Sequence, residues 1–372
     1  MVVGRYHAVP NLQRCGALGD NSRSINHPTI VVFVKQQASM DKLAYKGKPF
    51  SKQEFVIGGV TVYVYNSDKL EAYIELINLI YHTASHLHKQ LTDVPINTVY
   101  LIHGRGQDYT YTEQLAYNIL NQYYEKKGSP EVPMICITFD NRNHGQRLVS
   151  QLQNSSWNSG NATHALDMVS AIDGVIDDIK LIMQYLPSYL NLEYFLDPKL
   201  VKELGTAIKY VNILSGVSFG GHTVIRFASK YPQLVDAINP IVGCSDLTSL
   251  LVNRLVKTPI DSTDYDRKLF YFNYDELPIS RDQQKANYPP TFHQYLSSDD
   301  QNIWESFPMS LVKMFAAFGA KDVLVPPKLS RFWVESYEST NDATELFTQE
   351  DAGHECTPEM VDHLTTWLAK YY

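Results

Sequence analysis

The sequence predicts an α/β protein with a mostly parallel, eight-stranded sheet and helices on both faces. Six short apolar runs between residues 98 and 354 end in Gly, Asp or His, and helical patterns separate most of them. These runs are TVYLIHGRGQD, PMICITFDNRNHG, VNILSGVSFGG, INPIVGCSD, LVKMFAAFGAKD and TELFTQEDAGH. Such alternation is typical of parallel strands covered by helices. Two earlier β-branched runs, at 29–34 and 60–66, predict an antiparallel pair that starts the sheet.

Two segments predict long helices beside this sheet. Residues 67–91 carry apolar side chains along one side and begin at Ser67, a residue type that caps helices. Residues 164–186 show the same periodicity between two strand runs. Ligands of such sheets bind beyond the carboxyl ends of the strands, so the polar residues in the strand-end turns are the candidates for chemistry.

Composition and charge exclude several classes of protein. The 372 residues are 44% hydrophobic and 19% charged, as in ordinary globular domains. The formal net charge of -8 offers no basic face, so nucleic acid is not an expected partner. No apolar run reaches the roughly 18 residues of a membrane helix, and the N-terminus lacks the apolar region of a secretory signal. We therefore expect a cytoplasmic protein. Arg5 and Arg14, with no acid before Asp20, leave organelle import as the alternative.

The chain divides into a core with an extension and an insertion. Residues 1–28 are predicted to be a polar N-terminal extension, and 29–245 with 309–372 the core. Residues 246–308 break the alternation, because they contain no strand-like run and are rich in aromatic residues. We interpret them as a lid over the strand ends. The alternative is a helical subdomain whose aromatic side chains pack mostly on one another.

The segment Gly216–Gly221 predicts a catalytic serine. Its residues fit the pattern G-x-S-x-G, follow the apolar run VNIL and precede a helical pattern. A turn from strand to helix this sharp requires the residues two before and two after the serine to lack side chains. Ser218 then projects from the turn above a helix N-terminus, which favours the negative charge that develops during attack.

A serine hydroxyl needs a base, and the base needs a carboxylate that orients it. His354 follows the last strand run and precedes a helix start at Thr357 and Pro358. Asp322 ends the preceding strand run, next to the strand that delivers His354. Asp246, at the end of the strand run before that, is the alternative acid.

The oxyanion of a tetrahedral intermediate needs two backbone donors. The amide of Phe219, directly after the serine, is the first, and the amide of Arg105 in the sequence His103–Gly106 is the expected second. The latter loop lacks the Lys-Ser/Thr of a phosphate-binding loop. Four scattered cysteines without metal-type spacing predict neither a metal site nor a disulfide framework, and we expect no cofactor.

Together, HGRG, GVSFGG, GAKDVLVP and AGH resemble the motifs of the α/β-hydrolase fold superfamily over residues 55–372. The resemblance implies that fold and the order serine, acid, histidine. It also implies that Asp140, Arg142 and His144 in FDNRNHGQR are structural. The chain lacks the three-glycine run of the lipase branch. It also lacks an aspartate at position 218, which speaks against epoxide hydrolase and dehalogenase chemistry.

Other histidines are weaker candidates. His82, His86 and His88 include a pair four residues apart that a metal could bridge on a helix, but no acid or cysteine accompanies them. We interpret them as an exposed helix face. His164 and Asp167 begin a predicted helix and are interpreted as capping and packing residues.

The sequence thus predicts a serine hydrolase that cleaves a small-molecule carboxylic ester or thioester through an acyl-enzyme on Ser218, with His354 and Asp322. Two alternatives stay open: an amide or peptide hydrolase with the same residues, and a catalytically silent binding protein with this fold. The acyl chain length and the oligomeric state are not predicted.

Overall fold

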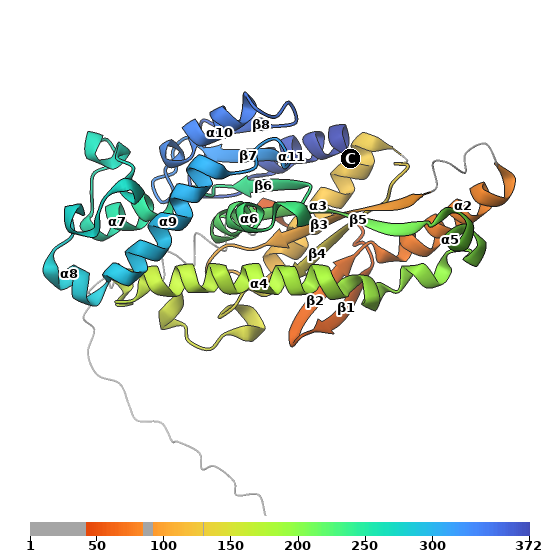
Figure 1. Ribbon diagram of the computed structural model, residues 1–372, viewed down its shortest axis with the longest axis horizontal. Coiled ribbons are helices and arrows are strands. Elements are labelled where there is room, and N and C mark those ends of the chain that lie inside the picture. Colours follow the sequence, from red (N-terminus) through yellow and green to blue (C-terminus); the bar gives the residue numbers. More distant parts are fainter. Residues whose placement is uncertain (1–41, 85–91, 129) are drawn as a thin grey trace, which may run out of the picture.

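A computed structural model of the chain describes residues 42–84, 92–128 and 130–372. Eight strands form one sheet in the order β1-β2-β4-β3-β5-β6-β7-β8 (Figure 1). The first two strands are antiparallel to their neighbours, and β3 to β8 run parallel. The strands are β1 (Lys52–Ile57), β2 (Val60–Tyr65), β3 (Asp93–Ile102), β4 (Met134–Phe139), β5 (Ala207–Val217), β6 (Ala237–Ile241), β7 (Lys313–Gly319) and β8 (Glu345–Gln349). The predicted fold class is confirmed.

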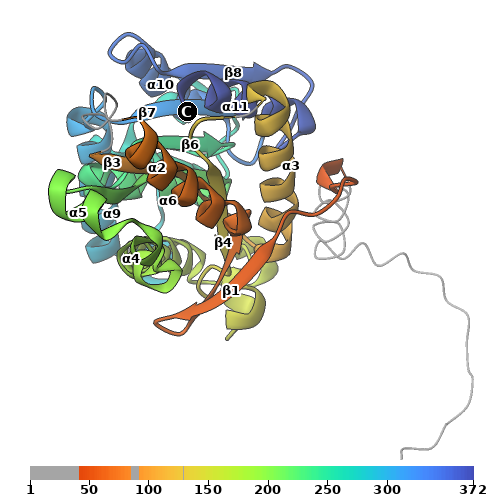
Figure 2. The same ribbon diagram turned by 90° about the vertical axis from the view of Figure 1, so that its right-hand side faces the viewer.

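Helices cover both faces of the sheet. The pair α3 and α11 packs on one face, and α4 with α6 packs on the other (Figure 2). The helices are α2 (Leu70–Thr83), α3 (Tyr109–Lys127), α4 (His164–Leu190), α5 (Pro198–Leu204), α6 (Phe219–Lys230), α7 (Leu247–Val256), α8 (Arg281–Ala286), α9 (Pro290–Ser306), α10 (Arg331–Glu338) and α11 (Pro358–Tyr371).

Two hydrophobic cores result, one on each side of the sheet. Successive side chains of β2 alternate between them: Val62 and Val64 join the core under α4, and Tyr63 and Tyr65 join the core under α3. This follows from the two-residue period of a strand. The interior strands are buried on both faces and therefore appear in the sequence as continuous apolar runs.

The sheet begins differently from the prediction. The run 29–34 lies outside the described residues, and β2 is paired on its two sides by β1 and β4. The strand β1 was not predicted, because it lies at the sheet edge with most side chains exposed, and its sequence KQEFVI does not alternate between polar and apolar residues. The turn between β1 and β2 contains Gly58 and Gly59, both with positive φ. A Gly-Gly pair between strands is a recognised hairpin signal.

The start of the first helix also differs. A 3₁₀ turn over Ser67–Lys69 precedes α2, and Asn66, with φ of 69°, occupies the capping position of that turn. The hydroxyl of Ser67 donates to Gln53 Oε1 instead of capping the helix. The prediction of a Ser67 N-cap is therefore wrong, because a side-chain acceptor on the neighbouring strand competes for the hydroxyl.

The segment 246–308 is helical throughout its regular structure and holds α7, α8 and α9, which lie together at one end of the molecule in Figure 1. Many of its aromatic side chains pack on one another, as in the pairs Phe270–Trp304 and Tyr288–Phe292. Tyr271 and Tyr295 are exposed. Most of the aromatic content is thus explained by packing.

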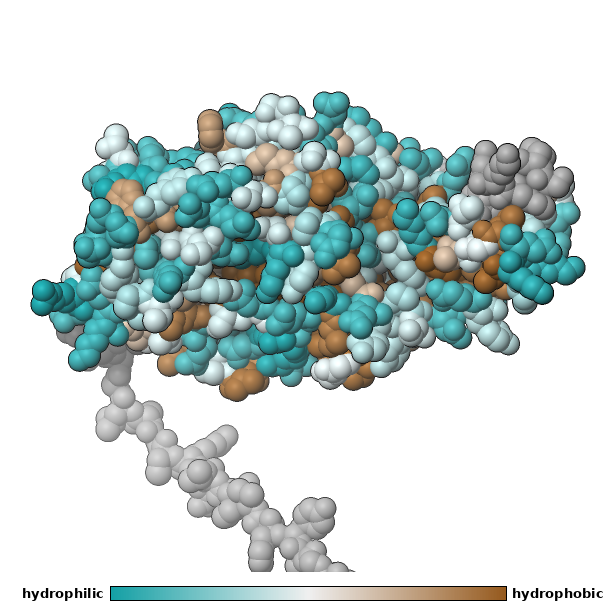
Figure 3. Space-filling model, in the orientation of Figure 1, coloured by the Kyte–Doolittle hydropathy of each residue, from teal (hydrophilic) through white to brown (hydrophobic). Residues whose placement is uncertain are grey.

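The surface shows no broad apolar area on the face drawn in Figure 3, where small apolar groups are scattered among hydrophilic ones. Within the described part of the chain, no helix has the length and apolar character needed to span a bilayer.

The strand order determines where the functional loops meet. The chain moves to one side of β3 with β4, then returns to its other side with β5 to β8. Such a reversal is a switch point, and the loops at the carboxyl ends of its two strands flank a crevice. Ile102 at the end of β3 lies opposite Gly216 near the end of β5. The strand order, with the sharp turn after β5, is that of the α/β-hydrolase fold.

Candidate active site

Ser218 lies in the turn between β5 and α6 with a backbone that serines rarely adopt. Its φ is 56° and its ψ is -111°. A non-glycine residue in this region is strained, and such strain occurs where surrounding contacts hold it. The amide of Ser218 donates to the carbonyl oxygen of Ile241 at 2.8 Å, which holds the turn against β6.

The glycines around Ser218 are required by close backbone contacts. A Cβ at Gly216 would overlap the carbonyl oxygen of Gly220, and a Cβ at Gly220 would overlap the carbonyl oxygen of Ile102. Both obstacles are backbone atoms, which cannot move aside as a flexible side chain can. The glycine requirement at these two positions agrees with the sequence prediction.

The variant Gly220→Ala should therefore be destabilised by at least about 1–3 kcal/mol, the cost of overpacking a rigid site. Urea unfolding monitored by circular dichroism measures this change. Gly353→Ala is the control, because the nearest atom to its added Cβ is Lys321 O at 3.9 Å. Equal midpoints for the two variants would contradict the close-contact explanation.

Ser218, His354 and Asp322 form a continuous chain of hydrogen bonds. Ser218 Oγ lies 2.7 Å from His354 Nε2, and His354 Nδ1 lies 2.7 Å from Asp322 Oδ2. The second oxygen of Asp322 accepts from the amides of Leu324 and Val325, both at 2.8 Å. The His354 side chain is 20% exposed and that of Asp322 is 1% exposed. The acid is fixed, and the imidazole is reachable from solvent.

The acid and the histidine meet because two strand-end loops touch. The amide of Lys321 donates to Ala352 O at 2.9 Å, and that of Ala320 donates to Gln349 O at 2.9 Å. A Cβ at Gly319 would overlap the carbonyl oxygen of Gly353. The loops after β7 and β8 are therefore held in contact, as neighbouring parallel strands allow.

The alternative acid, Asp246, has other partners. One of its oxygens accepts from the amide of Ser249 at 2.8 Å and caps α7. The other lies 3.7 Å from Lys268 Nζ. Burial raises the pKa of this carboxyl. The histidine nitrogen contacts Asp322 and not Asp246, so the geometry favours Asp322 as the orienting acid.

In the loop after β3, hydrogen bonds hold both the amide and the carbonyl oxygen of Gly104. Its amide donates to Gln107 Oε1 at 2.8 Å, and its carbonyl oxygen accepts from the Gln107 amide at 3.2 Å. Gly106 has a φ of 79°, which completes the tight turn. These contacts place the Arg105 backbone within a fixed turn beside the end of β5. The first expected donor, the amide of Phe219, belongs to the residue that begins α6, and the initial amides of a helix lack intrahelical acceptors.

His103 supports the same loop as a neutral imidazole. Its Nε2 accepts from the amide of Asn141 at 3.0 Å, so Nδ1 carries the proton and donates to Gly104 O at 2.8 Å. Burial, and next the charge of His144, lower the pKa of His103 to about 3. Both ring nitrogens are engaged in hydrogen bonds, so the side chain positions the loop.

This buried histidine predicts acid sensitivity. The pKa of His103 is about 3 in the folded state against 6.5 ordinarily, so the unfolded chain binds an extra proton below pH 6.5. Stability should fall by about 1.4 kcal/mol per pH unit on this account as the pH drops from 6.5 towards 3. In urea unfolding between pH 7.5 and 4.5, His103→Gln should show a correspondingly shallower dependence. The same slope in His103→Gln and in the exposed-site control His363→Gln would contradict this.

Hydrogen bonds and an ion pair hold the segment after β4 in place. Asp140 accepts from the amides of Tyr109 and Gln146, both at 2.8 Å. Arg142 pairs with Asp178 at 3.0 Å, and His144 Nδ1 donates to Arg142 O at 2.8 Å. These contacts join Asp140, Arg142 and His144 to neighbouring residues, and none of them involves Ser218. This agrees with a structural role.

The remaining candidate histidines were those considered for metal binding or for the start of a helix. His86 and His88 are outside the described residues, and His82 Nε2 lies 2.8 Å from Asp197 Oδ2. The described ranges contain no group of three ligand residues that would hold a metal. Asp167 accepts from Asn161 and Thr163 at the start of α4, where His164 is buried.

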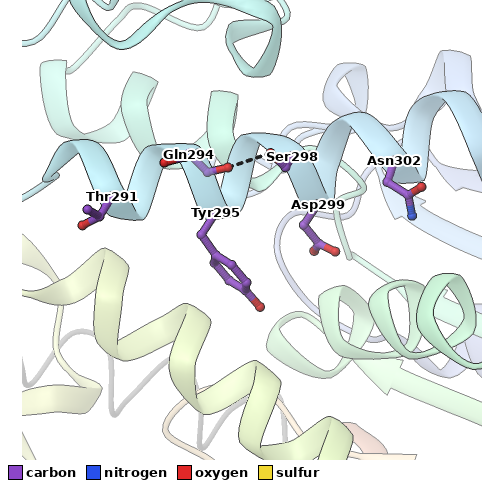
Figure 4. A pocket seen from close by; sticks show the side chains of 6 residues that line it. All are labelled: Thr291, Gln294, Tyr295, Ser298, Asp299 and Asn302. Carbon is purple, nitrogen blue, oxygen red and sulfur yellow. Dashed lines mark hydrogen bonds between the residues drawn. The ribbon is translucent and has the colours of Figure 1, made fainter.

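A separate hollow of about 520 Å³ lies along α9 (Figure 4). Its polar side chains join the helix to neighbours: Tyr295 donates to Asp173 at 2.8 Å, and Asp299 pairs with Arg226 at 3.1 Å. Neither Ser218 nor His354 lines it. We interpret this hollow as a space left where α9 packs against the core through these contacts.

Two residues at the site were missed from the sequence. Gln107 braces the loop after β3, and Arg254 on α7 donates through Nη2 to the carbonyl oxygen of Leu324. Leu324 lies two residues after the acid. No motif marks Arg254, because its segment is an irregular insertion without a repeated pattern. Gln107 lies three residues after Gly104, but a glutamine at that spacing belongs to no general motif and therefore predicts no function.

No known family model and no curated protein matches the sequence. Solved structures are similar in fold. An esterase from Pyrobaculum calidifontis is 12% identical, with 92% of each chain covered and a TM-score of 0.48. A protein from Thermus thermophilus is 12% identical, with 87% of this chain and 98% of that chain covered and a TM-score of 0.48. An esterase from Pyrococcus furiosus is 13% identical, with coverages of 88% and 97% and a TM-score of 0.46. Likenesses this low identify neither substrate nor site.

Proposed function

We propose that the chain is a serine hydrolase that cleaves a carboxylic ester or thioester through an acyl-enzyme on Ser218. The observation that carries the proposal is the pair of 2.7 Å contacts from Ser218 Oγ to His354 Nε2 and from His354 Nδ1 to Asp322 Oδ2. A nucleophile, a base and an orienting acid in this relation are what acyl transfer requires.

In the proposed reaction, Ser218 Oγ attacks the carbonyl carbon while His354 Nε2 takes the hydroxyl proton. The amides of Phe219 and Arg105 donate to the oxyanion that forms. His354 then gives its proton to the departing alcohol or thiol, which leaves an acyl-serine. Water attacks this ester as His354 takes its proton, and the acid is released with Ser218 restored. Asp322 keeps Nδ1 protonated and stabilises the imidazolium.

Residues 246–308 are proposed to act as the lid of this site. The segment follows the loop after β6, at the carboxyl ends of the strands, where Ser218 and Asp322 also lie. Through Arg254 it contacts Leu324 in the loop that carries Asp322. It would therefore shape the binding space for the substrate.

Burst kinetics test the proposal. With p-nitrophenyl acyl esters, an enzyme that forms an acyl-serine faster than it hydrolyses it releases up to one equivalent of nitrophenol at once. Rapid mixing at micromolar enzyme would measure this burst. Absence of both burst and turnover over acyl chains of two to twelve carbons would favour the silent binding protein instead.

Amide cleavage uses the same residues, and no observation favours it over ester cleavage. The ratio of kcat/KM for matched p-nitrophenyl esters and p-nitroanilides would separate the two activities. We expect the ester to be cleaved faster, because its leaving group departs more readily; a p-nitroanilide cleaved at a comparable kcat/KM would favour the amide hydrolase.

A further inference from the structure

Two arginines, on different elements, belong to or contact the loops that carry residues of the proposed site. Arg105 belongs to the loop after β3, and its Nη1 donates to Asn154 O at 2.9 Å. Arg254 belongs to α7, and its Nη2 donates to Leu324 O. The amide of Leu324 in turn donates to Asp322 Oδ1 at 2.8 Å. Arg254 is therefore linked through one residue to the proposed catalytic acid.

The two guanidinium charges act on the same small region. Burial, and next the charge of Arg254, lower the pKa of Arg105 to about 10. Burial first, then Arg105 and Arg254, lower the pKa of His164 to about 3. A guanidinium stays protonated at neutral pH, so both charges are present under working conditions. Two positive charges close together in a partly buried region raise the local attraction for anions.

Arg254 has no carboxylate partner in the described part of the chain. Four other arginines there each pair with an acid, namely Arg142, Arg147, Arg226 and Arg331. The buried Nε of Arg254 has no hydrogen-bond acceptor. The charge of Asp322 reaches Arg254, but the oxygens of that carboxylate already accept from His354, Leu324 and Val325.

A buried ring nitrogen of His164 also lacks a hydrogen-bond partner, as Nε of Arg254 does. Nδ1 of His164, at the start of α4, is buried and makes no hydrogen bond, although the charges of both arginines reach this ring. Removing polar and charged groups from water without partners is costly, and a ligand that supplies the missing contacts would offset this cost.

We infer that the ester cleaved at Ser218 carries a negatively charged oxygen group, a carboxylate or phosphate, that Arg254 binds together with Arg105. This inference rests on the proposed hydrolase function and names its substrate class. Guanidinium groups hold such anions through paired, charge-assisted hydrogen bonds. The two arginines would bind the charged group of the substrate, while its reacting carbonyl lies at Ser218.

Paired substrates test the inference. One pair is p-nitrophenyl hemiglutarate against p-nitrophenyl pentanoate, which share chain length and leaving group. p-Nitrophenyl 4-phosphonobutanoate adds a phosphorus-based charge, and 4-acetoxybenzoate against its methyl ester places the charge on the alcohol part. At least one charged ester should exceed its neutral partner in kcat/KM by roughly ten- to hundredfold, the range of a charged hydrogen-bonded contact. No preference in any of the pairs would overturn the inference.

The variant Arg254→Gln should bring that charged-to-neutral ratio close to one, mainly through KM of the charged ester. Arg254→Lys should retain part of the ratio, and Arg331→Gln, an arginine of the exposed face of α10, should retain all of it. Damage to the fold alone would lower kcat/KM for both esters equally. An unchanged ratio in Arg254→Gln would therefore also overturn the inference.

Binding to Ser218→Ala separates this inference from the proposed function. Calorimetry should detect monomethyl glutarate but not neutral dimethyl glutarate, and the added change Arg254→Gln should abolish the difference. If this binding holds while no ester is cleaved, the anion site stands and the hydrolase proposal fails. If esters are cleaved without charge preference and the two ligands bind alike, the anion site fails and the hydrolase proposal stands.

Discussion

Replacing Ser218 by alanine is expected to lower kcat on any substrate ester roughly 10⁴- to 10⁶-fold, the range found when the nucleophile of such a site is removed. The physical reason is that no other hydroxyl lies 2.7 Å from His354 Nε2 among the contacts of the described residues. The measurement is steady-state hydrolysis of the best p-nitrophenyl ester, with the unfolding midpoint checked in parallel.

Ser215→Ala is the matched control for this change. Ser215 lies three residues earlier on β5, is buried, and donates to Asn239 Oδ1 at 2.7 Å. Losing that bond should lower stability by about 1 kcal/mol and leave kcat within a few-fold of the wild type. Activity of Ser218→Ala within tenfold of the wild type would refute the assignment of the nucleophile.

The change Asp322→Asn should lower kcat roughly 10⁴-fold, with little effect on substrate binding. An amide at this position cannot hold His354 Nδ1 protonated and cannot stabilise the imidazolium. The Oδ1 acceptor for Leu324 and Val325 is retained in asparagine, so the loop should keep its shape. Steady-state kcat and KM measure the effect.

Asp246→Asn distinguishes the two acids that the sequence left open. Asparagine still caps α7 through the Ser249 amide, and only the contact with Lys268 weakens. The variant should keep kcat within about threefold of the wild type. If instead Asp246→Asn loses activity and Asp322→Asn does not, the 2.7 Å contact between His354 and Asp322 misidentifies the acid.

Local patterns explain which parts of this site the sequence predicts. The turn around Ser218 combines an apolar strand, glycines at fixed offsets and a helix, and each feature has a steric cause in the structure. Asp322 and His354 lie close together because neighbouring parallel strands place their end loops on the same side of the sheet. These features are short-range or set by topology, so they appear in the sequence.

The features that were missed depend on contacts between distant segments. The strand β1 is an exposed edge in which three polar residues are followed by three apolar ones, so alternating hydrophobicity does not reveal it. Arg254 reaches the site only because the irregular segment around α7 packs beside the loop after β7. Ser67 fails as a cap because Gln53, on β1, competes for its hydroxyl. Such contacts have no counterpart in local spacing.

The most direct test of the account is covalent labelling by a fluorophosphonate probe, followed by peptide mass spectrometry. Labelling should give one adduct per chain, located on Ser218, which is absent from Ser218→Ala and present in Ser215→Ala. Equal labelling of the wild type and Ser218→Ala, or an adduct on another residue, would contradict the claim that Ser218 is the nucleophile.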